Sequence, residues 1–187
     1  MLIIFTGNGK GKTTAALGQA ARMVGRGKRV LMIQFIKGPW KSGEDFIEIK
    51  RKSLGTARDE SQSIKNEGKF EIRKRGLGFV GILGDKLPRE EHVRAAQSAK
   101  SEAQKEIASG VWDLIILDEI NNAVHLGLLS AQEVLEAVSQ MPKEKFIIFT
   151  GRDAPKEFIE RADLVTEMKE VKHPFNDGEM AKIAVEF

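Results

Sequence analysis

The sequence contains no cysteine, so the chain forms no disulfide bond and offers no thiolate ligand to a metal. A cysteine-free chain fits a reducing compartment, and we expect a cytoplasmic protein. Long apolar runs are also missing, which excludes a membrane-spanning helix. The chain begins directly on a short apolar strand, with no room for a signal peptide. We therefore expect no membrane partner.

The chain lacks a large excess of either charge: 30 basic residues face 27 acidic ones, and the formal net charge is +3. So mild a charge argues against a nucleic-acid partner. Basic residues nevertheless gather between Lys50 and Arg75, where nine of them accompany four acids. A solvated loop accounts for this stretch, and a surface for an anionic partner is the alternative. The scarcity of aromatic residues among the basic ones counts against nucleic acid.

The remaining composition is typical of a globular protein, with 41% hydrophobic and 30% charged residues. A chain of 187 residues is long enough to bury a core without metals or disulfides. We expect a single domain over residues 1–187. Within it, residues 50–68 have few apolar side chains and no clear period, which predicts a mobile loop.

The first fourteen residues, MLIIFTGNGKGKTT, have the order of a phosphate-binding P-loop: an apolar strand, a glycine-rich turn and a helix-forming segment. In such a loop, backbone N–H groups and the helix N-terminus point at one anion. Lys12 adds a positive charge, and the Thr13 hydroxyl can bind Mg²⁺. Thr6 stands where the usual pattern has its first glycine, and a plain glycine turn is the alternative interpretation. The context favours a nucleotide site formed by Gly7, Asn8, Gly9, Lys10, Gly11, Lys12, Thr13 and Thr14.

Apolar runs alternate with helical patterns along the rest of the chain. Buried strands are predicted at 29–36, 111–117 and 146–149, and further strands at 69–74, 164–168 and 183–187. Helices are predicted after the P-loop, from Pro88 to Gly110, after the capping box of Ser130 and Glu133, and from Pro155. This alternation predicts an α/β, three-layer, P-loop NTPase-like fold with a mostly parallel sheet flanked by helices on both faces.

Two acids, Asp118 and Glu119, follow the predicted strand at 111–117. P-loop proteins carry a second nucleotide motif at such a position, where a carboxylate can hold Mg²⁺ opposite Thr13. A helix N-cap is the alternative role for Asp118, and the two roles are compatible. Trp40 lies on a polar loop, where ligand contact explains it as well as packing does. The three histidines have no metal-ligand spacing and are interpreted as structural.

Five blocks of the sequence occur in the same order in one known family. They are TGNGKGKTT (6–14), QFIKGPWKSGE (34–44), LDEIN (117–121), TGRDAP (150–155) and ADLVTEMKEVKHPF (162–175). On these blocks the chain resembles the P-loop type of ATP:corrinoid adenosyltransferase, also called cob(I)alamin adenosyltransferase. The resemblance covers most of the chain outside residues 45–110, and it includes the threonine at position 6.

The resemblance implies that a Co(I) corrinoid such as cobalamin attacks the 5′ carbon of ATP and expels inorganic triphosphate. It implies that Lys12 and the glycine loop bind the triphosphate, and that Thr13 holds Mg²⁺ with Asp118 or Glu119. It also implies that Phe79 and Trp40 face the corrin and that Glu44 and Arg152 contact a substrate. A homodimer and a flavoprotein reductase partner belong to the same expectation.

The chain departs from the family at one position of interest. An aromatic pair in a Gly-Phe-Thr-Trp loop packs beneath the corrin in the family; Phe79 matches this loop, but Gly81 stands where tryptophan is expected. Two other interpretations stay open. A P-loop ATPase or small-molecule kinase would release ADP or phosphate. An ATP-dependent nucleic-acid-binding module would use the basic stretch and bind in a salt-dependent way.

Overall fold

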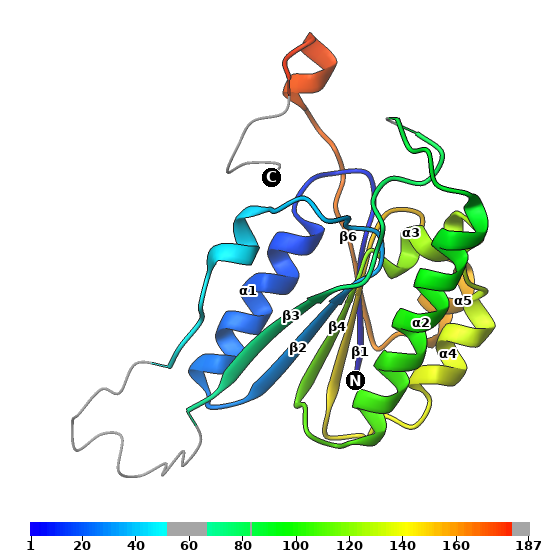
Figure 1. The fold of residues 1–187 in the computed structure, drawn as a ribbon. Coiled ribbons are helices and arrows are strands. Elements are labelled where there is room, and N and C mark those ends of the chain that lie inside the picture. Colours follow the sequence, from blue (N-terminus) through cyan, green and yellow to red (C-terminus); the bar gives the residue numbers. More distant parts are fainter. Residues whose placement is uncertain (52–66, 83, 181–187) are drawn as a thin grey trace.

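Six strands form one sheet in the order β3-β2-β4-β5-β1-β6 (Figure 1). The computed structural model describes residues 1–51, 67–82 and 84–180. Every pair of neighbouring strands runs parallel, so the carboxyl ends of all six meet at one edge of the sheet. The strands are β1 (Leu2–Thr6), β2 (Arg29–Gln34), β3 (Lys69–Lys74), β4 (Leu114–Asp118), β5 (Phe146–Thr150) and β6 (Leu164–Glu167).

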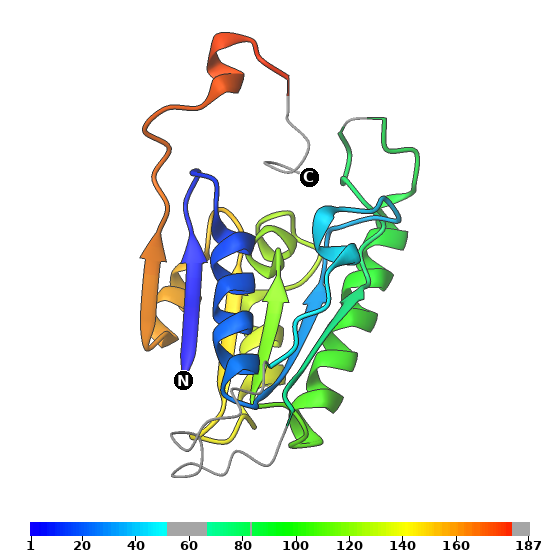
Figure 2. The same cartoon turned by 90° about the vertical axis from the view of Figure 1, so that its left-hand side faces the viewer.

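Helices cover both faces of this sheet, as the two views show (Figures 1 and 2). One face packs against α1 (Lys12–Gly25). The other face packs against α2 (Arg89–Ala108), α3 (Ile120–His125), α4 (Ala131–Val138) and α5 (Lys156–Arg161). Two short 3₁₀ helices, η1 (Gly43–Phe46) and η2 (Pro174–Asp177), lie beyond the carboxyl ends of the strands. The predicted three-layer α/β fold is confirmed, and the described sheet is wholly parallel.

Each face of the sheet has its own hydrophobic core, because successive side chains of a strand point to opposite faces. In β2, Val30 and Met32 pack toward α1, whereas Leu31 and Ile33 pack toward the helices of the other face. Since both faces are covered, these strands are continuous apolar runs with every one of these side chains buried. Each buried Ile, Leu or Met contributes about 1.5–3 kcal/mol to folding. Ala16 and Ala20 of α1 are fully buried, so this helix lies close to the sheet.

Several element boundaries differ from the sequence-based prediction. The strand predicted at 29–36 ends at Gln34, and the one predicted at 111–117 is β4, Leu114–Asp118. The short helix α3 was not predicted at all. Ser130 and Glu133 do form the expected capping box, with the Glu133 N–H donating to Ser130 Oγ at 3.2 Å. The strand predicted at 183–187 and most of the loop predicted at 50–68 lie outside the described residues.

Within the described residues, no helix is both long and apolar enough to cross a membrane.

Candidate active site

A cavity of about 1000 Å³ opens at the carboxyl edge of the sheet. Its walls come from the P-loop and α1, from the loop after β2, and from the tail that follows β6 and rises above the sheet (Figure 2). Most of the predicted site residues line it: Asn8, Gly9, Lys10, Gly11, Lys12, Thr13, Thr14, Glu44, Glu119 and Arg152. Gly7, Asp118, Trp40 and Phe79 are not among the lining residues.

The P-loop wraps around the Lys12 side chain. Lys12 Nζ donates to the carbonyl oxygens of Gly7 and Gly9, each at 2.8 Å. Burial of this ammonium group lowers the pKa of Lys12. Gly7 and Gly11 have φ angles of 91° and 115°, a backbone region that favours glycine, so the sequence of the loop follows from its shape.

The tail after β6 braces the P-loop from outside. The Gly9 N–H donates to the carbonyl oxygen of Met168 at 2.7 Å. A Cβ added to Gly9 would lie 2.8 Å from the Lys169 backbone, so only glycine fits here. Thr6, which replaces the usual glycine, is the last residue of β1, and its hydroxyl accepts from the Ala154 N–H at 3.2 Å. Thr6 therefore ties the first strand to the loop after β5.

Asp118 lies fully buried behind Thr13 at the end of β4. Its Oδ1 accepts from the hydroxyls of Thr13 at 2.8 Å and Thr150 at 2.7 Å, and its Oδ2 accepts from Gln34 Nε2 at 3.0 Å. All three donors are side chains from other elements. The alternative role of Asp118 as a helix N-cap is wrong, because α3 begins at Ile120 and Glu119 occupies the N-cap position.

Glu119 is held in an uncommon conformation beside Asp118. Its φ is 63°, a left-handed value for a residue that is not glycine, and its N–H donates to the Thr150 hydroxyl at 2.9 Å. Burial, and then the charge of Asp118, raise the pKa of Glu119 to about 7. Two acids thus share a poorly solvated corner of the site. Among the described residues, no group of three or more histidine, aspartate or glutamate side chains is placed to hold a metal ion.

The loop after β2 is tied to the same corner through Glu44. The Glu44 carboxylate forms an ion pair with Lys37 and accepts a longer hydrogen bond, 3.4 Å, from Gln34 Nε2. Burial alone would raise the pKa of Glu44, but the hydrogen bond and charge of Lys37 outweigh it and hold this pKa below its ordinary value. Glu44 is therefore a carboxylate whose charge is already compensated.

Trp40 and Phe79 meet beyond this loop, although they follow different strands. Their ring centroids are 5.8 Å apart and the rings are tilted by 36°. The indole lies on two glycines, since a Cβ at Gly38 or Gly78 would come within 2.7 Å or less of it. Even so, Trp40 is 62% exposed and Phe79 is 43% exposed. Space remains open around Gly81, where an added Cβ would have no neighbour within 4 Å.

A family model described as ATP:corrinoid adenosyltransferase BtuR/CobO/CobP matches residues 1–187. The chain belongs to this family. Corrinoid adenosyltransferase of Escherichia coli (strain K12) is 34% identical over 187 residues, which cover all of this chain and 85% of the relative. The Salmonella typhimurium protein, corrinoid adenosyltransferase CobA, is 33% identical with the same coverage, and the Pseudomonas aeruginosa one is 34% identical over 83% of its length.

These matches confirm the resemblance on which the predicted function depends. As a member of this family, the chain is a transferase whose substrates are ATP and a corrinoid. The cavity, with a P-loop in one wall and acids behind it, is where this family member has room for a nucleotide.

Part of the cavity lining was not predicted from the sequence. The tail contributes Glu170, Lys172, His173, Pro174, Asn176, Glu179 and Met180 to the cavity. Residues 162–175 belong to the family resemblance, but nothing in their sequence indicates that they lie opposite the P-loop. Gln34 and Thr150 were also missed as partners of Asp118. A signal existed for both, because each ends a buried strand at the edge where ligands bind in α/β sheets.

Two of the three histidines, His92 and His125, are not among the residues that line the cavity. His92 is buried, and its Nε2 lies 3.0 Å from Asp85 Oδ2. His125 lies 3.8 Å from Asp153 Oδ2 at the end of α3. His173 differs, since it lines the cavity.

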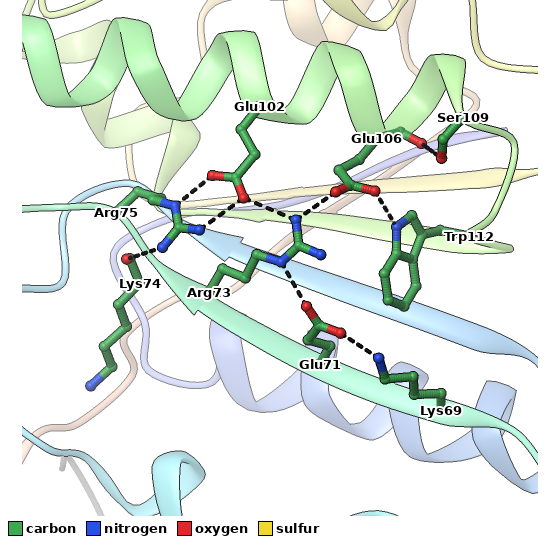
Figure 3. A network of polar contacts seen from close by, with 9 residues as sticks. All are labelled: Lys69, Glu71, Arg73, Lys74, Arg75, Glu102, Glu106, Ser109 and Trp112. Atoms are coloured by element: carbon green, nitrogen blue, oxygen red, sulfur yellow. Dashed lines mark hydrogen bonds and ion pairs between the residues drawn. The ribbon is translucent and has the colours of Figure 1, made fainter.

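The basic stretch predicted between residues 50 and 75 is largely paired where the structure describes it. Arg73 lies 2.9 Å from Glu102 and 2.6 Å from Glu106, both on α2, and Arg75 also contacts Glu102 (Figure 3). Lys69 pairs with Glu71, Lys74 with Asp45, and Lys50 with Glu48. These basic side chains therefore stabilise β3 against α2 or pair locally, which leaves less free charge for a polyanion than the sequence indicates.

Proposed function

We propose that this adenosyltransferase moves the 5′-deoxyadenosyl group of ATP to the cobalt of a Co(I) corrinoid and releases inorganic triphosphate. The electron pair of Co(I) forms the cobalt–carbon bond. The carbon–oxygen bond at the 5′ position breaks, and its electrons leave with the triphosphate. One observation carries the proposal: the P-loop and the loop after β2 both contribute walls to one cavity. The loop after β2 bears Glu44 and Trp40.

The leaving group gains negative charge, and the P-loop end of the cavity is suited to stabilise it. Lys12 Nζ now occupies the centre of the loop, on the Gly7 and Gly9 carbonyls, and would turn from them to the phosphates. The N–H groups at the start of α1 add their partial positive charge. Because cobalt is the nucleophile, the reaction needs no general base, which agrees with a compensated Glu44.

The residues behind the P-loop fit a magnesium ion. Thr13 Oγ1 and Asp118 Oδ1 lie 2.8 Å apart, and both are hard oxygen donors of the kind Mg²⁺ prefers. Burial and the charge of Asp118 raise the pKa of Glu119 despite the nearby charges of Lys12, Lys37 and Arg152, so a bound cation would stabilise both acids as carboxylates. Thr13 with Asp118 or Glu119 would hold Mg²⁺, which would neutralise charge on the triphosphate.

The corrin would lie at the other end, against the apolar surface of Trp40 and Phe79. Both rings are exposed although they pack on each other, so they offer an apolar surface beside the loop that lines the cavity with Lys37, Gly43 and Glu44. This pair supports a contact with the macrocycle in which Trp40 offers the second aromatic ring that Gly81 cannot. Arg152, which lines the cavity, would contact the nucleotide.

Product analysis tests the reaction. With Mg-ATP and chemically reduced cob(I)alamin under anaerobic conditions, we expect adenosylcobalamin and triphosphate in equal amounts. Lys12→Ala should lower the rate by about 100-fold or more, because a charge that acts on the leaving group is lost. Release of ADP or phosphate without a cobalt–carbon bond would refute the proposal and favour an ATPase or kinase.

Other features implied by the resemblance stay predictions. These are the flavoprotein reductase that would supply Co(I) and the homodimer. The cytoplasmic location and the single domain over residues 1–187, which were inferred from the composition and the length of the chain, are also predictions. The same product assay, repeated with cobalamin and with its precursors, would determine which corrinoid is used.

A further inference from the structure

One buried side chain joins the acidic corner of the site to the loop that carries Trp40. Gln34, the last residue of β2, is fully buried. Its Nε2 donates to Asp118 Oδ2 at 3.0 Å and lies 3.4 Å from Glu44 Oε1. One amide nitrogen therefore contacts both a carboxylate at the P-loop and a carboxylate of the β2 loop.

The bonding of this amide is incomplete. Among the described residues, Gln34 Oε1 is one of two buried side-chain polar atoms without a hydrogen-bond partner. A buried acceptor without a donor costs free energy, and an apolar residue would avoid that cost. The neighbouring β2 residues, Met32 and Ile33, are apolar and equally buried. A glutamine at this position therefore needs an explanation beyond packing.

The contacts continue from Glu44 to the aromatic pair. Glu44 pairs with Lys37, so the two ends of the segment 37–44 are held together around Trp40. Lys74 Nζ donates to the carbonyl oxygen of Trp40 at 2.7 Å and fixes the middle of the segment to the end of β3. The indole in turn rests on Gly78 and Phe79. A shift of Glu44 is thus transmitted to Trp40 through a short, braced segment.

We propose that Gln34 is a positioning residue that couples the Thr13–Asp118 end of the site to the placement of Trp40. This inference rests on the proposed function, because it takes the P-loop end as the Mg-ATP site. When Mg-ATP binds, the hydrogen bonds that Asp118 accepts from Thr13 and Gln34 change. Gln34 then moves relative to Glu44, and the segment 37–44 carries the change to the indole.

The tryptophan content of the chain makes this coupling measurable without turnover. There are two tryptophans, Trp40 and Trp112, and Trp112 is buried in the network between β3 and α2. In a Trp112→Phe protein, fluorescence reports on Trp40 alone. We expect saturating Mg-ATP, without corrinoid, to change this emission. Adding Gln34→Met should reduce the change by about fivefold or more, while calorimetry still shows nucleotide binding.

Gln97→Met is the matched control. Gln97 Nε2 donates to Glu133 Oε1 at 3.0 Å between α2 and α4, so the same substitution removes a similar hydrogen bond from a place unconnected to the site. The Trp40 response should then persist. If Gln34→Met fails to fold, Glu44→Ala removes the other contact and should reduce the response equally.

The outcomes separate the inference from the function on which it rests. If Mg-ATP binds but leaves Trp40 emission unchanged, or if Gln34→Met and Glu44→Ala keep the full response, the coupling through Gln34 is wrong and the proposed reaction is untouched. If no variant, including the parent protein, binds Mg-ATP, the proposed function and the inference fall together.

Discussion

Two groups of acidic side chains in this molecule have opposite surroundings. Glu71, Glu102 and Glu106 lie between β3 and α2, where Arg73 reaches all three (Figure 3). Hydrogen bonds from Lys69 and Arg75 hold the pKa of Glu71 and of Glu102 below their ordinary values. Asp118 instead accepts from hydroxyls and an amide. Burial, and then the charge of Asp118, raise the pKa of Glu119 to about 7, although Lys12, Lys37 and Arg152 act against this rise.

The surroundings distinguish acids that stabilise the fold from acids that are suited to bind a cation. In the β3–α2 network, each carboxylate already has its cation, so the network adds stability and has little to offer a substrate. At Asp118 and Glu119, burial and the repulsion between the two acids outweigh the nearby charges of Lys12, Lys37 and Arg152. This arrangement costs stability and favours a divalent cation. The direction of the pKa shift thus distinguishes the two groups: the pKa of Glu119 in the cavity is raised, and the pKa values of Glu71 and Glu102 in the network are lowered.

Asp118→Asn replaces the buried carboxylate with a neutral amide of similar size. We expect adenosyl transfer to fall by about 100-fold or more, because the buried charge that would hold Mg²⁺ is lost. Stability should change by less than about 1 kcal/mol, since the new amide can still accept from Thr13 and Thr150 and can donate to the unpartnered Gln34 Oε1 after the glutamine amide turns. Initial rates and chemical denaturation measure the two effects.

Asp113→Asn is the control, since Asp113 comes directly before β4 and Asp118 ends it. Asp113 accepts from the Arg29 N–H at 2.9 Å and from Lys145 Nζ at 3.1 Å. This substitution should cost about 1 kcal/mol of stability and leave the rate unchanged. Equal losses of rate in both variants would mean that Asp118 acts through the fold alone.

A substitution in the β3–α2 network should lower stability and leave the rate unchanged, the opposite of what we expect for Asp118→Asn. Arg73→Met should lower the free energy of unfolding by about 2 kcal/mol, because three partly buried carboxylates lose their shared cation. The rate at saturating substrates should stay the same. Arg94→Met, which removes an exposed pair with Glu91 at 3.7 Å, should cost less than about 0.5 kcal/mol. A large loss of activity in Arg73→Met would assign this network to the site.

The sequence predicted the fold well where burial and periodicity act locally. β1, β2, β4 and β5 are apolar runs because both faces of the sheet are covered, and such runs are visible without a structure. Strand ends were predicted less well. β2 stops at Gln34, because its carbonyl oxygen accepts from Arg75 and Gly76 where β3 turns away, and no local pattern encodes that partner.

For the site, the sequence predicted the P-loop and the two acids, since each is a contiguous motif. The partners of Asp118 come from three other elements, so only the topology brings Thr13, Gln34 and Thr150 together. The meeting of Trp40 and Phe79 has the same origin, because β2 and β3 are neighbours in the sheet. The roles of these residues in catalysis stay predictions until the variants are measured.

The smallest expected effect is a difference in pH dependence between the two groups of acids. Glu119 binds its proton more tightly in the folded state, so between about pH 4.5 and pH 7 folding takes up a proton and stability of the ligand-free protein falls as pH rises. Glu71 and Glu102 have lowered pKa values, so their contribution is present above their ordinary pKa and is lost as pH falls below it. The contributions of these acids to stability should therefore be greatest at about pH 4.5, where the acid loss ends and the decline caused by Glu119 begins.

Thermal unfolding as a function of pH tests both slopes, each with its own variant. Glu119→Gln should flatten the decline between about pH 4.5 and pH 7 and leave the acid limb unchanged, because the neutral amide does not titrate. Arg73→Met should weaken the acid limb alone. If Mg²⁺ binds at Asp118 and Glu119, it should raise the unfolding temperature more at about pH 8 than at about pH 5, where Glu119 is protonated. An equal shift at both pH values would remove Glu119 from the ligands of the ion and leave Thr13 and Asp118 as the candidates.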